Sequence, residues 1–318
     1  MQYIPLEQPV AELENKITEL KRLSSSRAIN LDHEIEKLEE KCANVRTELF
    51  SNLTPYETAQ IARHPGRPRF KDLMQEICSF FVELHGDRNF FDDPAIVGGL
   101  GTIGKESCVF IGHQKGKGTK DNIYRNFGMP QPEGYRKALR IMSMAERFSL
   151  PIITFVDTPG AYPGIGAEQR GQAEAIAKNI MVMSKLRVPI ITIVVGEGGS
   201  GGALALAVAN KVLMMEHSIY SVISPEGCAS ILMKDASKAA AAADALKLTA
   251  SYAKTHKIVD TIIKEPLGGA HRDVVKTAAS IKRNLLKALK DFSEFSGDEL
   301  IKHRVEKFNQ MGQVIEVK

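Results

Sequence analysis

The sequence lacks the features that mark secreted and membrane-spanning proteins. Its 318 residues include four cysteines that lie far apart and form no CxxC pair, a pattern typical of reduced thiols rather than of a disulfide framework or a zinc knuckle. No segment approaches the roughly 18 consecutive apolar residues of a membrane-spanning helix. The first residues also lack the basic, apolar and small-residue succession of a secretory signal. We therefore expect a cytoplasmic protein.

Other absences narrow the possible functions. The eight histidines show neither an HExxH motif nor another paired ligand spacing, so we expect no metal site. A net charge of +4 is too small, in a chain of this length, to indicate nucleic acid as a partner. The apolar share of 43% and the charged share of 25% are those of an ordinary globular protein.

The N-terminal fifth carries a helical pattern of its own. Apolar residues recur at alternating four- and three-residue steps in two stretches, which the polar residues 24–26 separate. The stretches are Val10, Leu13, Ile17 and Leu20, and then Leu31, Ile35, Leu38, Cys42, Val45 and Leu49. We expect an antiparallel helical hairpin over residues 8–50, within a docking segment of residues 1–65 that has no chemistry of its own.

Beyond the Pro- and Gly-rich break at 64–68, the pattern becomes that of an α/β domain, which we assign to residues 66–295. Short Ile/Val-rich runs, typical of strands covered on both faces, alternate with helical stretches. The expected strands are 109–112, 152–157, 190–195, 212–215 and 219–223, and the expected helices are 133–148, 168–186, 234–256 and 271–292. The charged tail, residues 296–318, is expected to pack loosely.

The sharpest motif is GEGGSGGALALAVA at 196–209, where an apolar run leads into five glycines and then into an Ala/Leu helix. Glycine permits tight turns and removes the Cβ atoms that would keep a ligand away from backbone N–H groups. The first N–H groups of a helix have no internal partner. We expect the amides of Gly201 and Gly202 to stabilise a phosphate or an oxyanion. Close helix–strand packing is the alternative reason for glycine here.

A dinucleotide-binding site is a rival interpretation of the same motif. Gly196, Gly198 and Gly201 match the GxGxxG fingerprint, and Glu216 follows near the place of a ribose-binding acid. The intervening helix is short for a crossover, and no longer series of strand–helix units follows. Spacing alone leaves this alternative open.

Two further loops could line the same pocket. In DTPGAYPGIGAEQRGQ (157–172), two Pro-Gly pairs follow a strand, and we expect the loop that they fix to form a second rigid wall of the pocket. Tyr162 could hydrogen-bond or stack there, and a half-buried loop aromatic is an equal alternative. The GTPase reading of this loop's DxxG element fails because the chain has no GxxxxGK[ST] loop. In GHQKGKGTKDNIYRNFG (112–128), His113 and Lys115 could meet an anionic ligand, although a solvated basic loop is an equal alternative.

No side-chain nucleophile or base accompanies these loops. Ser224 looks like a helix N-cap followed by Pro225, and it has no GxSxG elbow around it. Glycine loops without such a residue favour chemistry in which backbone donors stabilise enolate-like charge.

Long stretches of the sequence resemble the alpha subunit of bacterial acetyl-CoA carboxylase carboxyltransferase, over nearly the whole chain. These stretches are ELHGDRNF (83–90), IGHQKGKGTKDNIYRNFGMPQPEGYRKALR (111–140), ITFVDTPGAYPG (153–164), GEGGSGGALAL (196–206), YSVISPEGCASIL (220–232) and EPLGGAHRD (265–273).

The resemblance implies a crotonase-like fold of repeated ββα turns, with the N-terminal hairpin and C-terminal helices added. It implies an α2β2 assembly with a homologous beta subunit, which carries the family's zinc module. Biotin carboxyl carrier protein and biotin carboxylase are the further partners that the resemblance implies, and it implies no cofactor bound covalently to this chain. The reaction that it implies moves the carboxyl group of carboxybiotin to acetyl-CoA, giving malonyl-CoA for fatty acid synthesis.

The resemblance also implies roles for particular residues. The amides of Gly201 and Gly202 would stabilise charge on the biotin ureido oxygen, and biotin itself would take the acetyl proton. The residues expected to contact substrate or biotin are Gly198, Gly199, Gly160, Ala161, Tyr162, Gly164, His113 and Lys115. On this view Gly202→Val would block the donors without disturbing assembly.

Two alternatives to this function differ in what they require. A self-contained crotonase-type hydratase or isomerase needs a carboxylate base, for which Glu168 and Glu197 are the candidates. A scaffold that recruits a biotin carrier without chemistry would tolerate changes in the glycines.

Overall fold

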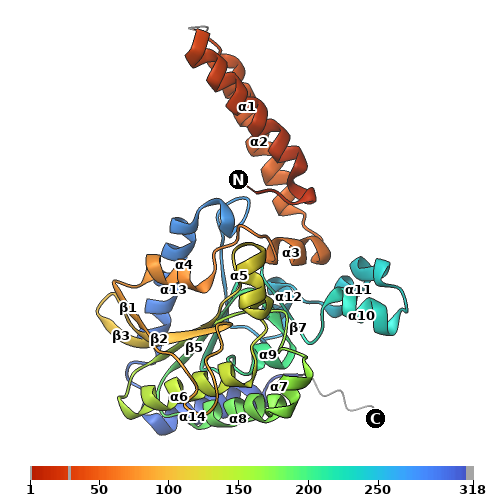
Figure 1. Ribbon diagram of the computed structural model, residues 1–318. Coiled ribbons are helices and arrows are strands. Elements are labelled where there is room, and N and C mark those ends of the chain that lie inside the picture. Colours follow the sequence, from red (N-terminus) through yellow and green to blue (C-terminus); the bar gives the residue numbers. More distant parts are fainter. Residues whose placement is uncertain (1, 28–29, 313–318) are drawn as a thin grey trace, which may run out of the picture.

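The structure is a computed structural model that describes residues 2–27 and 30–312. A helical hairpin, α1 (Gln8–Arg27) and α2 (Asp32–Ser51), projects from the body as an arm (Figure 1). Its seam buries Val10, Ile35 and Cys42, and the remaining residues of the two predicted stripes pack against them. The prediction of an antiparallel hairpin is confirmed. No helix among the described residues is long and apolar enough to cross a membrane.

The body is built on one mixed sheet. Its strands are β1 (Phe80–Glu83), β2 (Ile96–Ile103), β3 (Glu106–His113), β4 (Ile152–Thr158), β5 (Ile190–Gly199), β6 (Lys211–Met215), β7 (Ile219–Ser221) and β8 (Thr261–Ile263). β1, β2 and β3 are antiparallel neighbours, and β3, β4, β5, β6 and β8 continue the sheet in parallel. β7 pairs with the far end of β5. Every expected strand is present, whereas β1, β2 and β8 were not predicted.

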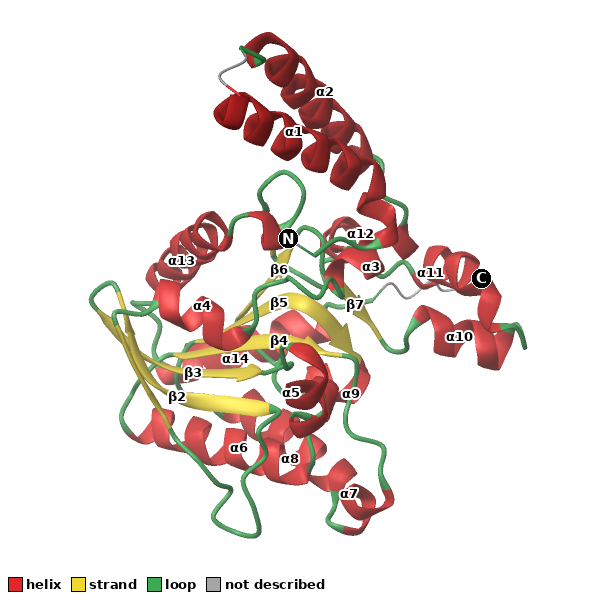
Figure 2. Ribbon diagram, turned by 45° about the horizontal axis from the view of Figure 1, so that its top comes forward, coloured by secondary structure: helices red, strands yellow, loops and turns green. Residues whose placement is uncertain are grey.

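Helices cover both faces of the sheet (Figure 2). The α-helices that follow the hairpin along the chain are α3 (Pro55–Ala62), α4 (Phe70–Ile77), α5 (Gly118–Tyr124), α6 (Pro132–Arg147), α7 (Ile165–Gln169), α8 (Gln172–Lys185), α9 (Ser200–Leu204), α10 (Pro225–Leu232), α11 (Ala239–Leu246), α12 (Ala250–Thr255), α13 (Val274–Asp291) and α14 (Gly297–Asn309). One core lies between the sheet and α6 and α8, and a second core lies between the sheet and α4 and α13. Both faces are buried, as the continuous apolar strands predict.

The expected helix at 234–256 is wrong. The structure divides it into α11 and α12, because Lys247 takes a left-handed conformation with φ of 54°. The carbonyl of Leu248 accepts a hydrogen bond from the Tyr220 amide at 2.9 Å, and Leu248 itself is fully buried. The alanine run stays helical within α11, and pairing of residues 248–249 with β7 interrupts the helix after it.

The expected loose packing of the C-terminal tail is also wrong over residues 297–309, which form α14. Leu300 and Arg304 are buried there, and the Arg304 guanidinium donates to the carbonyl of Val188 at 3.1 Å. A long charged side chain can pack along apolar surface while its head finds hydrogen-bond acceptors. Residues 313–318 lie outside the described residues. The domain boundaries at 65 and 295 stay a prediction.

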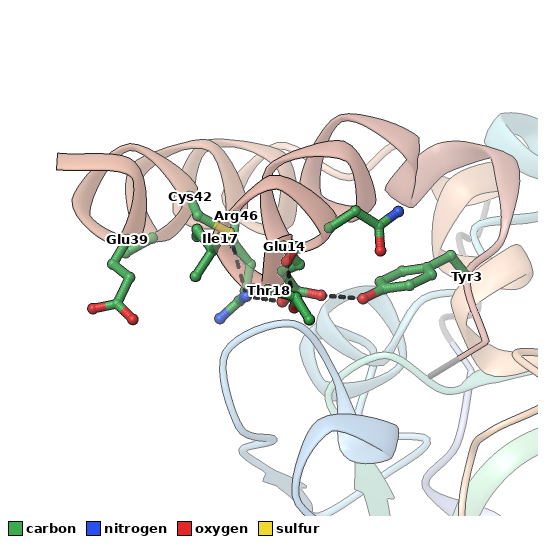
Figure 3. A pocket seen from close by; sticks show the side chains of 9 residues that line it. Tyr3, Glu14, Ile17, Thr18, Glu39, Cys42 and Arg46 are labelled. Carbon is green, nitrogen blue, oxygen red and sulfur yellow. Dashed lines mark hydrogen bonds and ion pairs between the residues drawn. The ribbon is translucent and has the colours of Figure 1, made fainter. Parts of the chain in front are cut away.

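The base of the arm is fixed to the body by buried polar groups. Glu7, which precedes α1, contacts His64 Nε2 at 2.9 Å and His271 Nε2 at 3.0 Å, and the two imidazoles stack 3.7 Å apart. Figure 3 shows the neighbouring contacts, in which Glu14 accepts from Tyr3 and pairs with Arg46. We call Glu7, His64 and His271 the arm cluster.

Candidate functional site

The site begins at an irregularity in the sheet. β4 and β5 pair regularly up to Val156 and Val194, and the next pair is Thr158 with Gly198, so that β5 contains extra residues at this point. Such a bulge bends and re-aims a strand. Beyond it, residues 197–199 of β5 pair with β7, and the chain then enters α9. The bulge therefore shifts the register of the glycine-rich segment, in which Gly198 still pairs with Thr158 of β4 and β7 is added as a second neighbour.

Two glycine-rich segments pack backbone against backbone after this point. A Cβ atom on Gly199 would lie 2.2 Å from the carbonyl oxygen of Pro159, and one on Gly202 would lie 2.7 Å from the amide nitrogen of Ala161. A Cβ on Gly198 would meet the ring of Tyr220 at 2.6 Å. Close packing therefore requires glycine at 198, 199 and 202, which supports the packing alternative at these positions.

Gly201 differs from its neighbours because its side is open. A Cβ there would meet only the side chain of Ile176, at 3.7 Å, and Gly201 is partly exposed. Among the described residues, no hydrogen-bond acceptor is found for the amide of Gly201 or of Gly202. Because α9 has only five residues, its macrodipole adds little, and any anion stabilisation must come from these amides directly.

The loop after β4, which the sequence predicts as the second wall, is held rigidly. The Thr158 hydroxyl donates to the carbonyl of Gly160 at 2.7 Å and accepts from its amide at 3.1 Å. The Tyr162 amide donates to the carbonyl of Pro130 at 3.0 Å. The Tyr162 ring lies against Gly164, where a Cβ would approach it to 2.3 Å. The structure thus brings Gly160 and Ala161 beside Gly202, while Tyr162 packs on its own loop.

A buried ion network lies at the bulge. Lys115 Nζ is 2.7 Å from Asp157 Oδ1 and 2.7 Å from Glu197 Oε2. Arg63 Nε contacts the other Glu197 oxygen at 2.6 Å, and Arg69 Nη1 lies 3.4 Å from Asp157 Oδ2. Burial by itself raises the pKa of both carboxyls, but the neighbouring cations outweigh burial and hold each pKa below its usual value.

His113 is not the loop cation that the sequence suggested. It is the last residue of β3 and is 1% exposed. Its ring nitrogens lie near the backbone of Phe155 and Gly202 without full hydrogen-bond geometry. Burial lowers the pKa of His113 to about 4, so the ring is neutral near pH 7. Lys115 is likewise no free cation, since Asp157 and Glu197 both engage it.

An apolar pocket of about 290 Å³ borders the start of α9. Ser200 and Leu204 form one side of it, and Tyr220 and Val222 form another. Ser200 is exposed and has a φ of 50°, a left-handed conformation that is uncommon for serine. The pocket thus contacts Ser200, the residue before Gly201, while Gly201 itself is not among its lining residues.

Within residues 2–27 and 30–312, one group has the composition of a metal site, namely the arm cluster. Its hydrogen bonds speak against a metal ion. The Gly66 amide donates to His64 Nδ1 at 3.0 Å, which places the proton of a neutral His64 on Nε2, the atom facing Glu7. Arg272 Nη2 also lies 3.6 Å from Glu7. The cluster is a carboxylate shared by two imidazoles.

Residues 3–312 match the family model described as acetyl co-enzyme A carboxylase carboxyltransferase-like. The chain belongs to this family. It is 54% identical, over 315 residues, to the acetyl-coenzyme A carboxylase carboxyl transferase subunit alpha of Azoarcus sp. (strain BH72), covering 99% of this chain and 98% of the relative. With the same subunit of Burkholderia multivorans (strain ATCC 17616 / 249) it shares 56% identity over 311 residues, 98% of this chain and 96% of the relative.

Solved structures show that the family's fold extends to distant proteins. A transcarboxylase 12S chain with hydrolysed methylmalonyl-coenzyme A matches at 19% identity and a TM-score of 0.59, over 82% of this chain and 46% of that one. A chain of a Pseudomonas malonate decarboxylase hetero-tetramer in complex with coenzyme A matches at 16% identity and a TM-score of 0.59, over 75% of this chain and 93% of that one. The predicted crotonase-like α/β class is confirmed.

The surroundings of the acidic residues bear on the two rival functions, a self-contained hydratase and a dinucleotide-binding protein. Glu197, a candidate base of a self-contained hydratase, has both oxygens paired with cations, and the lowered pKa makes it a weak base. Glu168 is exposed on α7. Glu216, the expected ribose-binding acid of a dinucleotide site, is paired with Lys264 and accepts from the Glu265 amide at 3.2 Å. The cations that engage Glu197 and Glu216 therefore count against both rival functions that depend on these two acids.

Sequence reasoning singled out Lys115 and, as a candidate base, Glu197, but it missed Asp157, Arg63 and Arg69 of the ion network. The sequence places Asp157 at the end of an expected strand, and it places Arg63 and Arg69 on either side of the Pro- and Gly-rich break at 64–68. A clue was present, because several ionisable residues stand at the carboxyl ends of predicted parallel strands, where ligand sites form. Ser224 is an N-cap, as expected, and accepts from the Gly227 amide at 3.0 Å.

Proposed function

We propose that the chain is the alpha subunit of an acetyl-CoA carboxylase carboxyltransferase. Together with a beta subunit it moves the carboxyl group of carboxybiotin to acetyl-CoA, giving malonyl-CoA for fatty acid synthesis in the cytoplasm. Biotin arrives on a carrier protein, after a separate biotin carboxylase has loaded it. Full-length similarity to alpha subunits and the open amide of Gly201 support this function.

The chemistry follows from what the site contains. Carboxybiotin breaks its N–C bond to release carbon dioxide, and the electron pair remains on the ureido group, with charge on its oxygen. The amides of Gly201 and Gly202 are the proposed donors to that oxygen, each worth about 3 kcal/mol of barrier in comparable oxyanion holes. Biotin then takes a proton from the acetyl methyl group, and the resulting enolate attacks carbon dioxide. No side-chain base is needed.

The first experiment is carboxyl transfer from malonyl-CoA to free biotin, measured for the chain alone, the beta subunit alone and both together. We expect transfer only with both, because the enolate-stabilising half of the site belongs to the partner. Full activity of the lone chain would contradict the half-site proposal. A stable complex without transfer would instead favour the scaffold alternative.

A second experiment isolates the donor. Gly201→Pro removes one N–H at the first turn of a helix, where proline is tolerated and the N–H has no helical partner. Gly201→Ala, the matched control, adds a Cβ and keeps the N–H. In complexes that assemble normally with the beta subunit, we expect kcat to fall by about 100-fold or more for the proline variant alone. Equal activity of the two variants would contradict the oxyanion assignment at Gly201.

A further inference from the structure

The ion network lies at the bulge of β5, between Val194 and Gly198, immediately before the chain enters α9. The Asp157 carboxylate accepts a hydrogen bond from the Glu197 amide at 3.0 Å, inside the irregular stretch of the β4–β5 pairing. A side chain thus holds a backbone group where the regular ladder is interrupted. The fit is tight, because a Cβ on Gly196 would lie 2.3 Å from Asp157 Oδ1. Asp157 therefore fixes β5 shortly before Gly201.

Lys115 completes this arrangement from the neighbouring strand. It follows β3 and places one ammonium group between Asp157 and Glu197, at 2.7 Å from each. Its side chain is 9% exposed, and the two carboxylates are 3% and 9% exposed. Two buried carboxylates this close repel each other unless a cation neutralises them. Lys115 is the cation that both of them share.

From these contacts we infer that Lys115, Asp157 and Glu197 are positioning residues for the carboxyl-transfer site. They hold the bulge of β5 in one geometry, and the bulge aims the amide of Gly201. None of the three needs to touch substrate. This inference rests on the proposed function, since it assigns the network a purpose only if the Gly201 amide acts on the reacting group.

The main test is Lys115→Met in the complex with the beta subunit. Methionine keeps much of the side-chain volume and removes the charge. We expect kcat for carboxyl transfer to fall by about 100-fold, as a displacement of about 1 Å in a reacting geometry can do, while KM for malonyl-CoA changes less than about threefold. Lys117→Met is the matched control, because Lys117 lies on the same loop, is 66% exposed and pairs with Asp72.

Two readouts separate positioning from a general structural effect. In Lys115→Met, Asp157 and Glu197 lose the cation that they share and keep only Arg69 and Arg63. One of the two carboxylates should then take up a proton more readily as the pH falls, so the ratio of variant to wild-type activity should rise from pH 8 to pH 6. The other ionisable groups packed here are Arg63, Arg69, Glu226 and His113. The double variant Lys115→Met/Asp157→Asn should have a kcat at least about tenfold higher than Lys115→Met alone. It removes one of the two negative charges, and the side-chain oxygen of the new asparagine can still accept the hydrogen bond from the Glu197 amide.

The outcomes can be distinguished. An inactive wild-type complex would overturn the proposed function itself. An active wild-type complex in which Lys115→Met behaves like Lys117→Met would overturn the positioning role alone. If Lys115→Met does not assemble, Glu197→Gln carries the test, since it keeps the backbone bond to Asp157 and loses the charge. Wild-type kcat in an assembled Glu197→Gln complex would likewise overturn the inference.

Discussion

Two buried clusters of ionisable residues lie in different parts of this molecule and stabilise different segments of it. The ion network at the β5 bulge holds a backbone amide of Glu197 and lies just before the open Gly201. The arm cluster instead joins a residue before α1 to His64 and His271, at the base of the projecting hairpin (Figure 1). Burial and ionic pairing alone therefore do not distinguish the two clusters. They differ in the backbone segment that each one fixes, which is β5 before Gly201 in one case and the base of the hairpin in the other.

The largest expected effect comes from breaking the arm cluster. Burial by itself would raise the pKa of Glu7, but hydrogen bonds from His271 and His64 outweigh it and hold the pKa far below its usual value. Glu7→Ala should therefore lower the free energy of unfolding by about 3 kcal/mol, measured by urea denaturation. Exposed Glu12 provides the control, Glu12→Gln.

Carboxyl transfer by the assembled Glu7→Ala complex should stay within about threefold of wild type under conditions where the protein is folded. A loss of kcat as large as that of Lys115→Met would show that the arm cluster also affects the carboxyl-transfer site. That result would contradict the distinction between the arm cluster and the ion network.

The second effect concerns His113, which lies beneath the glycine-rich segment. Its folded pKa of about 4 is below the ordinary value of 6.5, so the unfolded chain binds the proton more readily. The contribution that neutral His113 makes to the free energy of unfolding is fully present above pH 6.5 and is lost as the pH falls toward 4. The expected loss is about 2 kcal/mol by pH 5. Urea denaturation at pH 7 and pH 5 should show a smaller loss for His113→Gln, and an unchanged loss would contradict the assignment.

The smallest expected effect separates two adjacent glycines. Gly202→Ala places a Cβ 2.7 Å from backbone atoms of the 160–161 segment, whereas Gly201→Ala meets one side chain at 3.7 Å. We expect Gly202→Ala to lose about 1–2 kcal/mol more stability than Gly201→Ala, measured by thermal and urea unfolding. Equal losses would mean that the two segments separate more easily than their packing indicates.

The spacing of apolar residues was sufficient to predict those helices and strands in which the spacing is most regular. The hairpin and the Ile/Val-rich strands follow from apolar spacing, because each of them buries a regular face. β2 escaped prediction since Gly98, Gly99 and Gly101 interrupt its apolar pattern. α14 escaped because its charges conceal the buried Leu300 and Arg304.

The candidate site was predictable only in part. The glycine motif pointed to backbone donors, but the close approach of residues 160–161 to Gly202 depends on tertiary packing. It makes Gly202→Val a poor test of the donors, since the added side chain would clash with that backbone. The partners of the ion network lie 82 and 134 residues apart in the sequence, a separation at which local patterns carry no information about contact.

The most direct test of this account is a structure of the chain assembled with its beta subunit and bound to biotin. We predict that the ureido oxygen lies about 2.7–3.1 Å from the amide nitrogen of Gly201, with Lys115 still between Asp157 and Glu197. A ureido oxygen bound by other groups, with the Gly201 amide facing protein atoms, would contradict the account.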